Sequence, residues 1–303
     1  MPEKLYRFPV GPFNYSVSSE ITAVRQAVEF LYADYPSLPE NSWVDFTLRV
    51  SPVGRFRWLR RNPEAQVFIG DFPPFPSFDQ RISPAMLEWG MNWCIWLNVA
   101  HLIIFHAAML EFKGNGLILA ADSGEGKSTL AAGLSLAGWR LLSDELTLID
   151  PDDTETVNGG LAVAKMVPIP RPICLKNESI KIVRDMFPQA AFSHEYPDTG
   201  KGLVAHVKPT ADSVHRAKQR VVPRWIIFPK YVKGASPTWT PWEKAEAFIR
   251  LGQHGDAYSV LGKKGFQTLA DVISHCDCWR FEYGNLEDAV LHFRELGNGS
   301  EPC

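Results

Sequence analysis

The sequence predicts an α/β fold built around a phosphate-binding loop, and three observations indicate it. An apolar run over residues 117–121 leads into a glycine-rich turn over residues 122–126. Lys127 then opens a segment with helical spacing. A second apolar strand, over residues 140–149, follows one helix later and carries two adjacent acids. Strand, glycine-rich loop and helix in this order are typical of P-loop proteins.

The first 80 residues are expected to form a small α+β subdomain. Apolar residues at helical spacing predict a helix over residues 18–31, with Ser19 as a possible N-cap. Residues 43–50 alternate between polar and apolar side chains, as an edge strand does. The proline-rich connection at residues 70–76 marks a natural boundary before the next part of the chain.

The core that contains the loop is expected over residues 84–234. It begins with a Trp-rich buried helix over residues 84–100 and a strand over residues 101–111. A turn at residues 113–116 joins that strand to the loop-bearing strand as a hairpin. A short strand over residues 224–229 closes the core.

After the loop, the chain is expected to alternate between helices and turns. A helix follows the loop over residues 128–138, and another starts after Asn177. The segment 151–155 reads as a polar turn. The remaining residues, 235–303, form the expected C-terminal helical region, with three helical patterns at 241–251, 264–275 and 286–296.

Composition excludes several classes of protein. The net charge of −3 gives no electrostatic case for nucleic acid or an anionic membrane, so the basic and aromatic run at residues 55–61 is interpreted as an exposed strand or loop face. Residues 89–110 contain no Asp, Glu, Lys or Arg, but two Asn and two His residues there are costly in lipid. Five irregularly spaced cysteines fit a reducing compartment. We therefore expect a soluble cytoplasmic protein.

The loop residues have the chemistry that binds nucleotide phosphates. Gly124 and Gly126 let backbone N–H groups turn inward around phosphate oxygens, and the helix N-terminus adds partial positive charge. Lys127 can reach the terminal phosphates, and the Ser128 hydroxyl can bind Mg²⁺. Ala121 replaces the first glycine of the usual pattern, which is tolerable if its φ is negative. The predicted nucleotide-binding residues are Asp122, Ser123, Gly124, Glu125, Gly126, Lys127, Ser128 and Thr129.

The acids on the second strand, Asp144 and Glu145, are candidates for metal binding and for receiving a proton from an acceptor hydroxyl. They would lie beside the loop if the two strands are neighbours in one sheet. Adjacent residues on a strand point to opposite faces, so both acids can serve one site only if the strand ends or bulges there.

These motifs resemble a known family. His106, the loop and the acid pair match, in order and spacing, the catalytic domain of bacterial HPr serine kinase/phosphorylase; His106 lies fifteen residues before Ala121. The resemblance is closer to the HPr-kinase-related proteins called kinase A. Its further motifs lie at residues 89–94, 141–145, 170–173, 175–177 and 204–206.

The resemblance implies a P-loop kinase core of the HPr kinase and phosphoenolpyruvate carboxykinase type, which uses ATP and Mg²⁺ to phosphorylate a serine hydroxyl. It implies that Asp144 is the base toward that hydroxyl, that Glu145 and Ser128 bind the metal, and that His106 lies beside the catalytic acid. One family signature supplies a further metal-binding acid. The corresponding segment here keeps Arg171 without an acid, so phosphorylase activity and a carrier-protein substrate do not follow.

Four further residues are candidate contacts for substrate or phosphate: Arg171, Lys201, His206 and Lys208. Cations on loops can neutralise charge on a transferring phosphoryl group. A solvated lysine hairpin, and a structural turn around Arg171, remain the alternatives.

Together these features predict an ATP- and Mg²⁺-dependent kinase that acts on a hydroxyl, with serine of a protein or peptide as the expected acceptor and with Asp144, His106 and Lys127 as catalytic residues. A small-molecule kinase on the same fold and a non-catalytic nucleotide-sensing module remain open. The expected partners are a nucleotide and an unidentified protein, peptide or small-molecule acceptor. A homo-oligomer is possible, and neither nucleic acid nor a membrane is expected.

Overall fold

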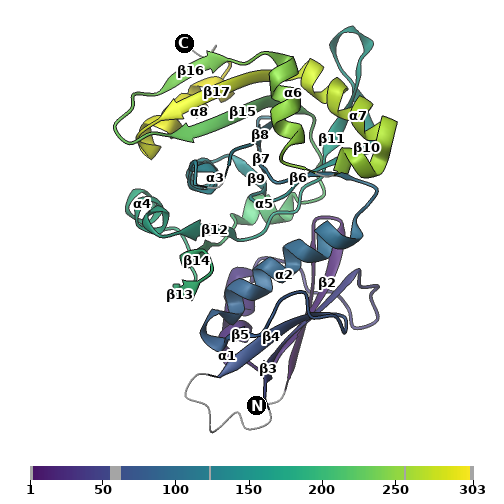
Figure 1. Cartoon of the computed structure of the whole chain (residues 1–303), viewed down its shortest axis with the longest axis vertical. Helices are drawn as coiled ribbons and strands as arrows, with labels where there is room; N and C mark the ends of the chain where they lie inside the picture. Colours follow the sequence, from purple (N-terminus) through teal and green to yellow (C-terminus); the bar gives the residue numbers. More distant parts are fainter. Residues whose placement is uncertain (1–2, 55–62, 123, 256, 301–303) are drawn as a thin grey trace.

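The computed structural model describes residues 3–54, 63–122, 124–255 and 257–300. The predicted basic and aromatic face at residues 55–61, and Ser123 of the loop, lie outside these ranges. The described residues form helices and four β-sheets, which confirms the predicted mixed α/β fold. Figure 1 shows the N-terminal sheet at one end of the molecule and the largest sheet at the other.

The N-terminal sheet has the strand order β1-β2-β3-β4-β5. Its strands and the two helices that accompany it are β1 (Lys4–Val10), β2 (Phe13–Ser19), α1 (Thr22–Leu31), β3 (Phe46–Val53), β4 (Glu64–Ile69), β5 (Phe78–Asp79) and α2 (Ser83–Asn98). The helix expected from residue 18 begins at Thr22 because β2 continues through Ser19. The Ser19 hydroxyl accepts a hydrogen bond from the backbone N–H of Ile21, at 3.0 Å, and so supports the turn into the helix.

Helix α2 packs on this N-terminal sheet rather than on the loop-bearing sheet (Figure 1). Its Gly90 lies so close to β4 that a Cβ atom there would be 2.9 Å from Val67 Cγ1. The predicted boundary at residues 80–84 therefore separates the sheet from the helix that covers it. No helix in the described ranges is long and apolar enough to cross a membrane.

The largest sheet has the order β16-β17-β15-β8-β7-β9. Its strands are β7 (Ala108–Phe112), β8 (Asn115–Leu119), β9 (Arg140–Ser143), β15 (Pro223–Tyr231), β16 (Thr238–Pro241) and β17 (Asp277–Tyr283). Strands β8, β15 and β17 run parallel, and β7 forms the predicted hairpin with β8. The C-terminal region is therefore not purely helical as expected, because β16 and β17 extend this sheet.

Helices cover both faces of the largest sheet. They are α3 (Lys127–Leu136), α6 (Lys244–Gly252), α7 (Ala257–His275) and α8 (Leu286–Gly297). Leu117 and Leu119 of β8 pack in one apolar cluster with α3 and α8, whereas Ile118 of the same strand packs in the other cluster with α7. This alternation follows from the period of two in a strand and produces a three-layer arrangement.

Two predicted strands are each broken in the middle. The strand expected over residues 101–111 is β6 (Ile103–Phe105) followed by β7, and the strand over 140–149 is β9 followed by β10 (Thr147–Thr156). At the first break the chain passes from a smaller sheet, ordered β11-β10-β6, into the largest sheet, and at the second break it passes from the largest sheet into the smaller one. Strand β10 also continues through the expected polar turn at 151–155, to pair with β11 (Ala162–Met166).

The two breaks lie side by side, because Met109 pairs with Ser143 on one side of them and Phe105 pairs with Thr147 on the other. His106 lies in the first break and the two acids lie in the second. A third sheet, ordered β12-β14-β13, completes the surroundings of the site. Its strands and the helices next to it are β12 (Ile173–Lys176), α4 (Glu178–Met186), β13 (Tyr196–Thr199), β14 (Gly202–Val207) and α5 (Ala211–His215).

A buried ion pair joins β7 to β9. The Arg140 Nε atom is 2.6 Å from Glu111 Oε2, and both side chains are almost fully buried. Burial works to raise the pKa of Glu111. The Gly114 N–H, Arg140 and Arg216 outweigh it and hold the pKa of Glu111 below its usual value.

We expect Glu111→Gln to lower the free energy of unfolding at neutral pH by about 3–5 kcal/mol, because it leaves the Arg140 charge buried without its partner. A carboxyl group with a lowered folded-state pKa stabilises above its unfolded pKa of about 4.3, and that contribution is lost as pH falls through the folded value. Urea denaturation from pH 7 to pH 3 should therefore show the difference between parent and variant shrinking in acid. The exposed Glu295→Gln is the control, and a difference that stays constant over this range would contradict the assignment.

Candidate functional site

The glycine-rich loop lies between β8 and α3, as predicted. Gly124 and Gly126 have φ values of +95° and +91°, a region that favours glycine. Ala121 is not among the residues with positive φ, so the condition for alanine at this position is met. A Cβ on Gly126 would lie 2.5 Å from the Tyr283 hydroxyl, which donates a hydrogen bond to the Gly126 carbonyl oxygen.

Two of the predicted loop residues have partners within the protein. The Glu125 carboxylate accepts a hydrogen bond from the Asp122 N–H at 2.8 Å, and its carbonyl oxygen accepts one from the Tyr231 N–H. The Asp122 carboxylate pairs with Arg250 on α6. Glu125 therefore fixes the shape of the loop and ties it to the end of β15.

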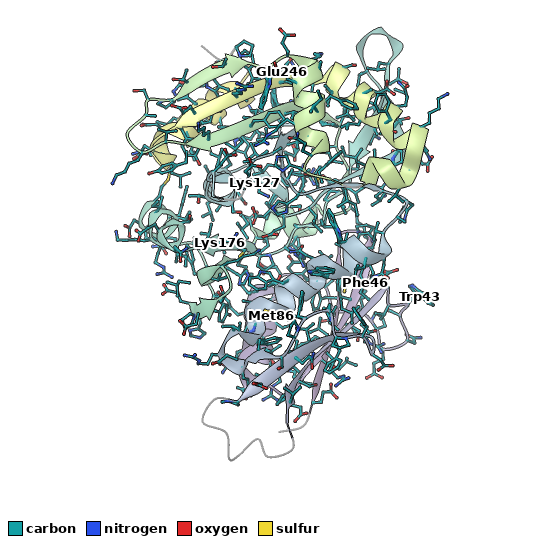
Figure 2. The ribbon with its side chains drawn as sticks, in the orientation of Figure 1. Trp43, Phe46, Met86, Lys127, Lys176 and Glu246 are labelled. Atoms are coloured by element: carbon teal, nitrogen blue, oxygen red, sulfur yellow. The ribbon has the colours of Figure 1, made fainter. Side chains whose placement is uncertain are left out.

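A cavity of about 500 Å³ opens at the loop. It brings together most of the predicted site residues: His106, Asp122, Gly124, Gly126, Lys127, Ser128, Thr129, Glu145 and Lys201. It also includes residues to which sequence reasoning gave no role: Cys174, Leu175, Lys176, Asn177, Ser179 and Gly200. Lys127 and Lys176, both labelled in Figure 2, face this cavity from the start of α3 and the end of β12.

The acids reach the loop although the condition given for this, that the two strands are neighbours in one sheet, is not met. Strand β7 lies between β8 and β9, so the loop-bearing strand and the acid-bearing strand are not neighbours. The acids follow the end of β9, where the regular alternation of side chains stops. Lys127 Nζ donates a hydrogen bond to the Asp144 carbonyl oxygen at 3.3 Å.

Asp144 is buried and is not among the residues that line the cavity. Burial raises its pKa to about 6, while Lys127 and a hydrogen bond from Ser128 work against that rise. Its Oδ2 atom accepts a hydrogen bond from the Cys174 N–H at 3.3 Å. Its Oδ1 atom has no hydrogen-bond partner among the described residues. A buried carboxylate oxygen without a partner is costly, so this atom is available for a ligand.

Glu145 faces the cavity among cations. Burial works to raise its pKa, but Lys201, Lys127, His106 and Lys176 together lower it to about 2. Loss of hydration and the charge of Lys127 lower the pKa of His106 to about 4. At neutral pH the site therefore presents an ionised carboxylate beside a neutral imidazole.

Three of the four tentative contacts lie away from the cavity. The Arg171 guanidinium is buried against α2, where it donates hydrogen bonds to the Glu88 carbonyl oxygen and to Asn92. Lys208 Nζ pairs with Asp34 in the N-terminal part, at 2.9 Å. His206 is 1% exposed on β14, opposite Cys174. Arg171 and Lys208 thus join the core to the N-terminal part, and Lys201 is the one member of this set that lines the cavity.

The donor set fits Mg²⁺ and the phosphates of a nucleotide. No group of three or more His, Cys, Asp or Glu residues that could hold a metal occurs within the described ranges. Mg²⁺ is usually held by one or two carboxylates together with substrate phosphates, so Ser128 with an adjacent acid is sufficient. The unpartnered Oδ1 of Asp144 is the atom that such a cation would engage. Glu178, the first residue of α4, lines a different cavity.

Comparison with known proteins gives a partial match in sequence. No family model matches the chain. The HPr kinase/phosphorylases of Streptococcus equi subsp. zooepidemicus and of Streptococcus equi subsp. equi are each 28% identical to it over 97 residues, which is 32% of this chain. The match spans about a third of the length of these relatives, 31% in each case.

A solved structure, the HPr(Ser) kinase/phosphatase from Coxiella burnetii, aligns with 65% of this chain and 99% of its own, at 12% identity and a TM-score of 0.27. A TM-score of that size carries no conclusion about the arrangement of the elements. The sequence matches agree with the resemblance indicated by the motifs around His106, the loop and the acid pair. These partial sequence matches confirm the predicted resemblance to HPr kinase/phosphorylase, whereas the closer resemblance to the kinase A proteins stays a prediction.

Proposed function

We propose that this protein is a kinase that transfers the γ-phosphoryl group of ATP, bound with Mg²⁺, to a hydroxyl group, with serine of a protein or peptide as the acceptor. The observation that carries the proposal is the single cavity that joins Lys127 and Ser128 of the loop to Glu145 and His106. A phosphate anchor, a metal-binding hydroxyl and an acid are the parts that phosphoryl transfer needs.

The residues of the chain have separate tasks in this proposal. The N–H groups of the loop bind the phosphates, and Lys127 places a buried positive charge next to them. Lys176 and Lys201 add positive charge in the same cavity. Most of the rate then comes from positioning and from neutralising the charge on the transferring group. Bound Mg²⁺ would supply further neutralisation of charge on the phosphates.

The family resemblance implies that Asp144 is the base toward the acceptor hydroxyl and that Glu145 binds the metal. The positions of the two acids favour the opposite assignment. Asp144 is buried near Ser128, and its Oδ1 atom has no partner among the described residues, which suits it to hold the cation together with that hydroxyl. Glu145 faces the cavity with His106, which suits it to accept the hydrogen bond of the acceptor hydroxyl.

Transfer of radiolabelled γ-phosphate tests the function directly. The full chain is incubated with Mg²⁺ and labelled ATP, with bacterial lysate proteins and serine peptides as acceptors. We expect label on serine of a protein or peptide, at a rate that depends on the acceptor. Tight nucleotide binding without label on any macromolecule would contradict the protein acceptor. Label on a metabolite in the same reaction would then identify a small-molecule kinase. Absence of label on any metabolite would identify a nucleotide-sensing module.

A further inference from the structure

The N-terminal part of the chain touches a residue of the catalytic cavity through helix α2. The tip of the hairpin formed by β13 and β14 carries Lys201, which lines the cavity together with the loop. Strand β13 contacts the short 3₁₀ helix η2 (Gln80–Ile82), which leads into α2 (Figure 1). The Lys201 ammonium lies over the indole ring of Trp89 on α2, with Nζ 4.8 Å from the ring centroid.

The backbone of the hairpin tip is held by side chains of its own and of the neighbouring strand. The Thr199 hydroxyl donates a hydrogen bond to the Gly202 carbonyl oxygen and accepts one from the Lys201 N–H. The Asn177 side-chain oxygen accepts a hydrogen bond from the Leu203 N–H at 3.1 Å. Gly202 has a φ of +84°, and a Cβ on it would lie 2.5 Å from that Asn177 oxygen. These contacts fix the backbone from which the Lys201 side chain extends.

The Lys201 side chain itself needs a further contact to hold one position. A lysine is a point charge on a flexible stem of four carbons, and Lys201 is exposed, so packing does not restrict this stem. The face of an aromatic ring attracts an ammonium group, and the indole ring does so most strongly. The Trp89 indole N–H has no hydrogen-bond partner among the described residues, so the ring face is the polar surface that Trp89 offers. The ring therefore limits where the Lys201 ammonium lies.

The charge of Lys201 acts at the end of the cavity where the chemistry is proposed. Burial works to raise the pKa of Glu145, and Lys201 is the cation that lowers it most. His106 lines the same part of the cavity and also has Lys201 among the cations that lower its pKa, after burial and Lys127. A fixed cation beside these groups can neutralise charge on the terminal phosphate of a donor.

We propose that Trp89 is a positioning residue that holds the Lys201 ammonium against the terminal phosphate of the donor. The N-terminal part, through α2, then completes the phosphoryl-transfer site. The inference rests on the proposed function, because it takes a nucleoside triphosphate to lie on the loop. It gives a task in the reaction to α2 and the sheet on which it packs, none of whose described residues lines the cavity.

Isothermal titration calorimetry on the full chain tests this with two probes, the β,γ-imido analogue of ATP and ADP, each with Mg²⁺. The ratio of the two affinities measures the contribution of the terminal phosphate. We expect the parent to prefer the triphosphate, and Lys201→Met to lower this preference about tenfold or more, the effect of losing one charged contact to phosphate. Trp89→Leu should lower it about threefold or more, because the ammonium remains but loses the ring that holds it.

Three further variants separate positioning from a general disturbance. Trp89→Leu added to Lys201→Met should lower the preference no further, since residues that act through one contact are not additive. Trp89→Phe keeps a ring and should retain most of the preference. Trp96, on the same helix, is 37% exposed and lines a separate apolar cavity, so Trp96→Leu is the matched control and should leave both affinities unchanged. Circular dichroism of each variant checks that it is folded.

The outcomes distinguish this inference from the proposed function. A Trp89→Leu protein that binds both nucleotides more weakly by the same factor would show a structural role and overturn the inference. So would an equal loss of preference in Trp89→Phe and Trp89→Leu, or a further loss in the double variant. A parent that binds both nucleotides with equal affinity would refute contact between Lys201 and the terminal phosphate while leaving nucleotide binding intact. A parent that binds neither would refute the proposed donor, and the inference with it.

Discussion

Lys127→Met is expected to lower the rate of phosphoryl transfer by about 10²–10³-fold, the effect of removing one preorganised group that stabilises developing charge. Lys127 is 7% exposed, so no solvent ion replaces its charge when it is lost. It also lies against both acids, since Asp144 and Glu145 raise its pKa in opposition to the lowering by burial. Methionine keeps the length and apolar character of the stem, so the change isolates the ammonium group.

The comparison is made by measuring γ-phosphate transfer at saturating Mg²⁺ and ATP for the parent, for Lys127→Met and for Lys218→Met. Lys218 is exposed and lies outside the catalytic cavity, so its variant should match the parent. A Lys127→Met protein that folds and retains a third or more of the parent rate would show that this lysine does not act on the transferring group.

The sequence was sufficient to predict the local parts of the site. The strand, the glycine-rich loop and α3 are contiguous, and each follows from residue types over a short window. The resemblance added His106 and the acid pair, and the structure brings His106 and Glu145 into one cavity with the loop. These agreements depend on spacing along the chain rather than on long-range pairing.

The non-local features could not be predicted in the same way. Both broken strands remain buried on either side of the break, so their apolar pattern continues while the chain changes sheets. Arg171 is a candidate phosphate contact in the sequence because its hydrogen-bond partners cannot be recognised there. Glu88 and Asn92 lie 83 and 79 residues away along the chain. Lys176 and Asn177 are within a matched motif, but only the folded structure shows that they line one cavity with the loop.

Asp144→Asn and Glu145→Gln are expected to lower the transfer activity in different ways, and this difference decides the roles of the two acids. If Asp144 and Ser128 hold the cation, Asp144→Asn should raise the Mg²⁺ concentration for half-maximal activity by about tenfold or more, since loss of a carboxylate ligand weakens a hard cation site. Saturating Mg²⁺ should then restore much of the rate. Glu145→Gln should instead keep its Mg²⁺ requirement and lose about 10²–10³-fold in kcat, the effect of removing one preorganised charged group that orients the acceptor hydroxyl.

The measurement is a Mg²⁺ titration of transfer activity for the parent and both variants, with Glu295→Gln on the outer part of α8 as the exposed control. The two side chains are adjacent in sequence, so a general disturbance of the β9–β10 break would affect both variants alike. The opposite pattern, with the Mg²⁺ requirement raised by Glu145→Gln alone, would support the assignment that the family resemblance implies. It would then require Asp144 to become accessible to the acceptor, because in this structure its carboxylate is buried and 5% exposed. A clear separation of the two effects in the expected direction would show that burial, rather than position in the shared motif, determines which acid meets the cation.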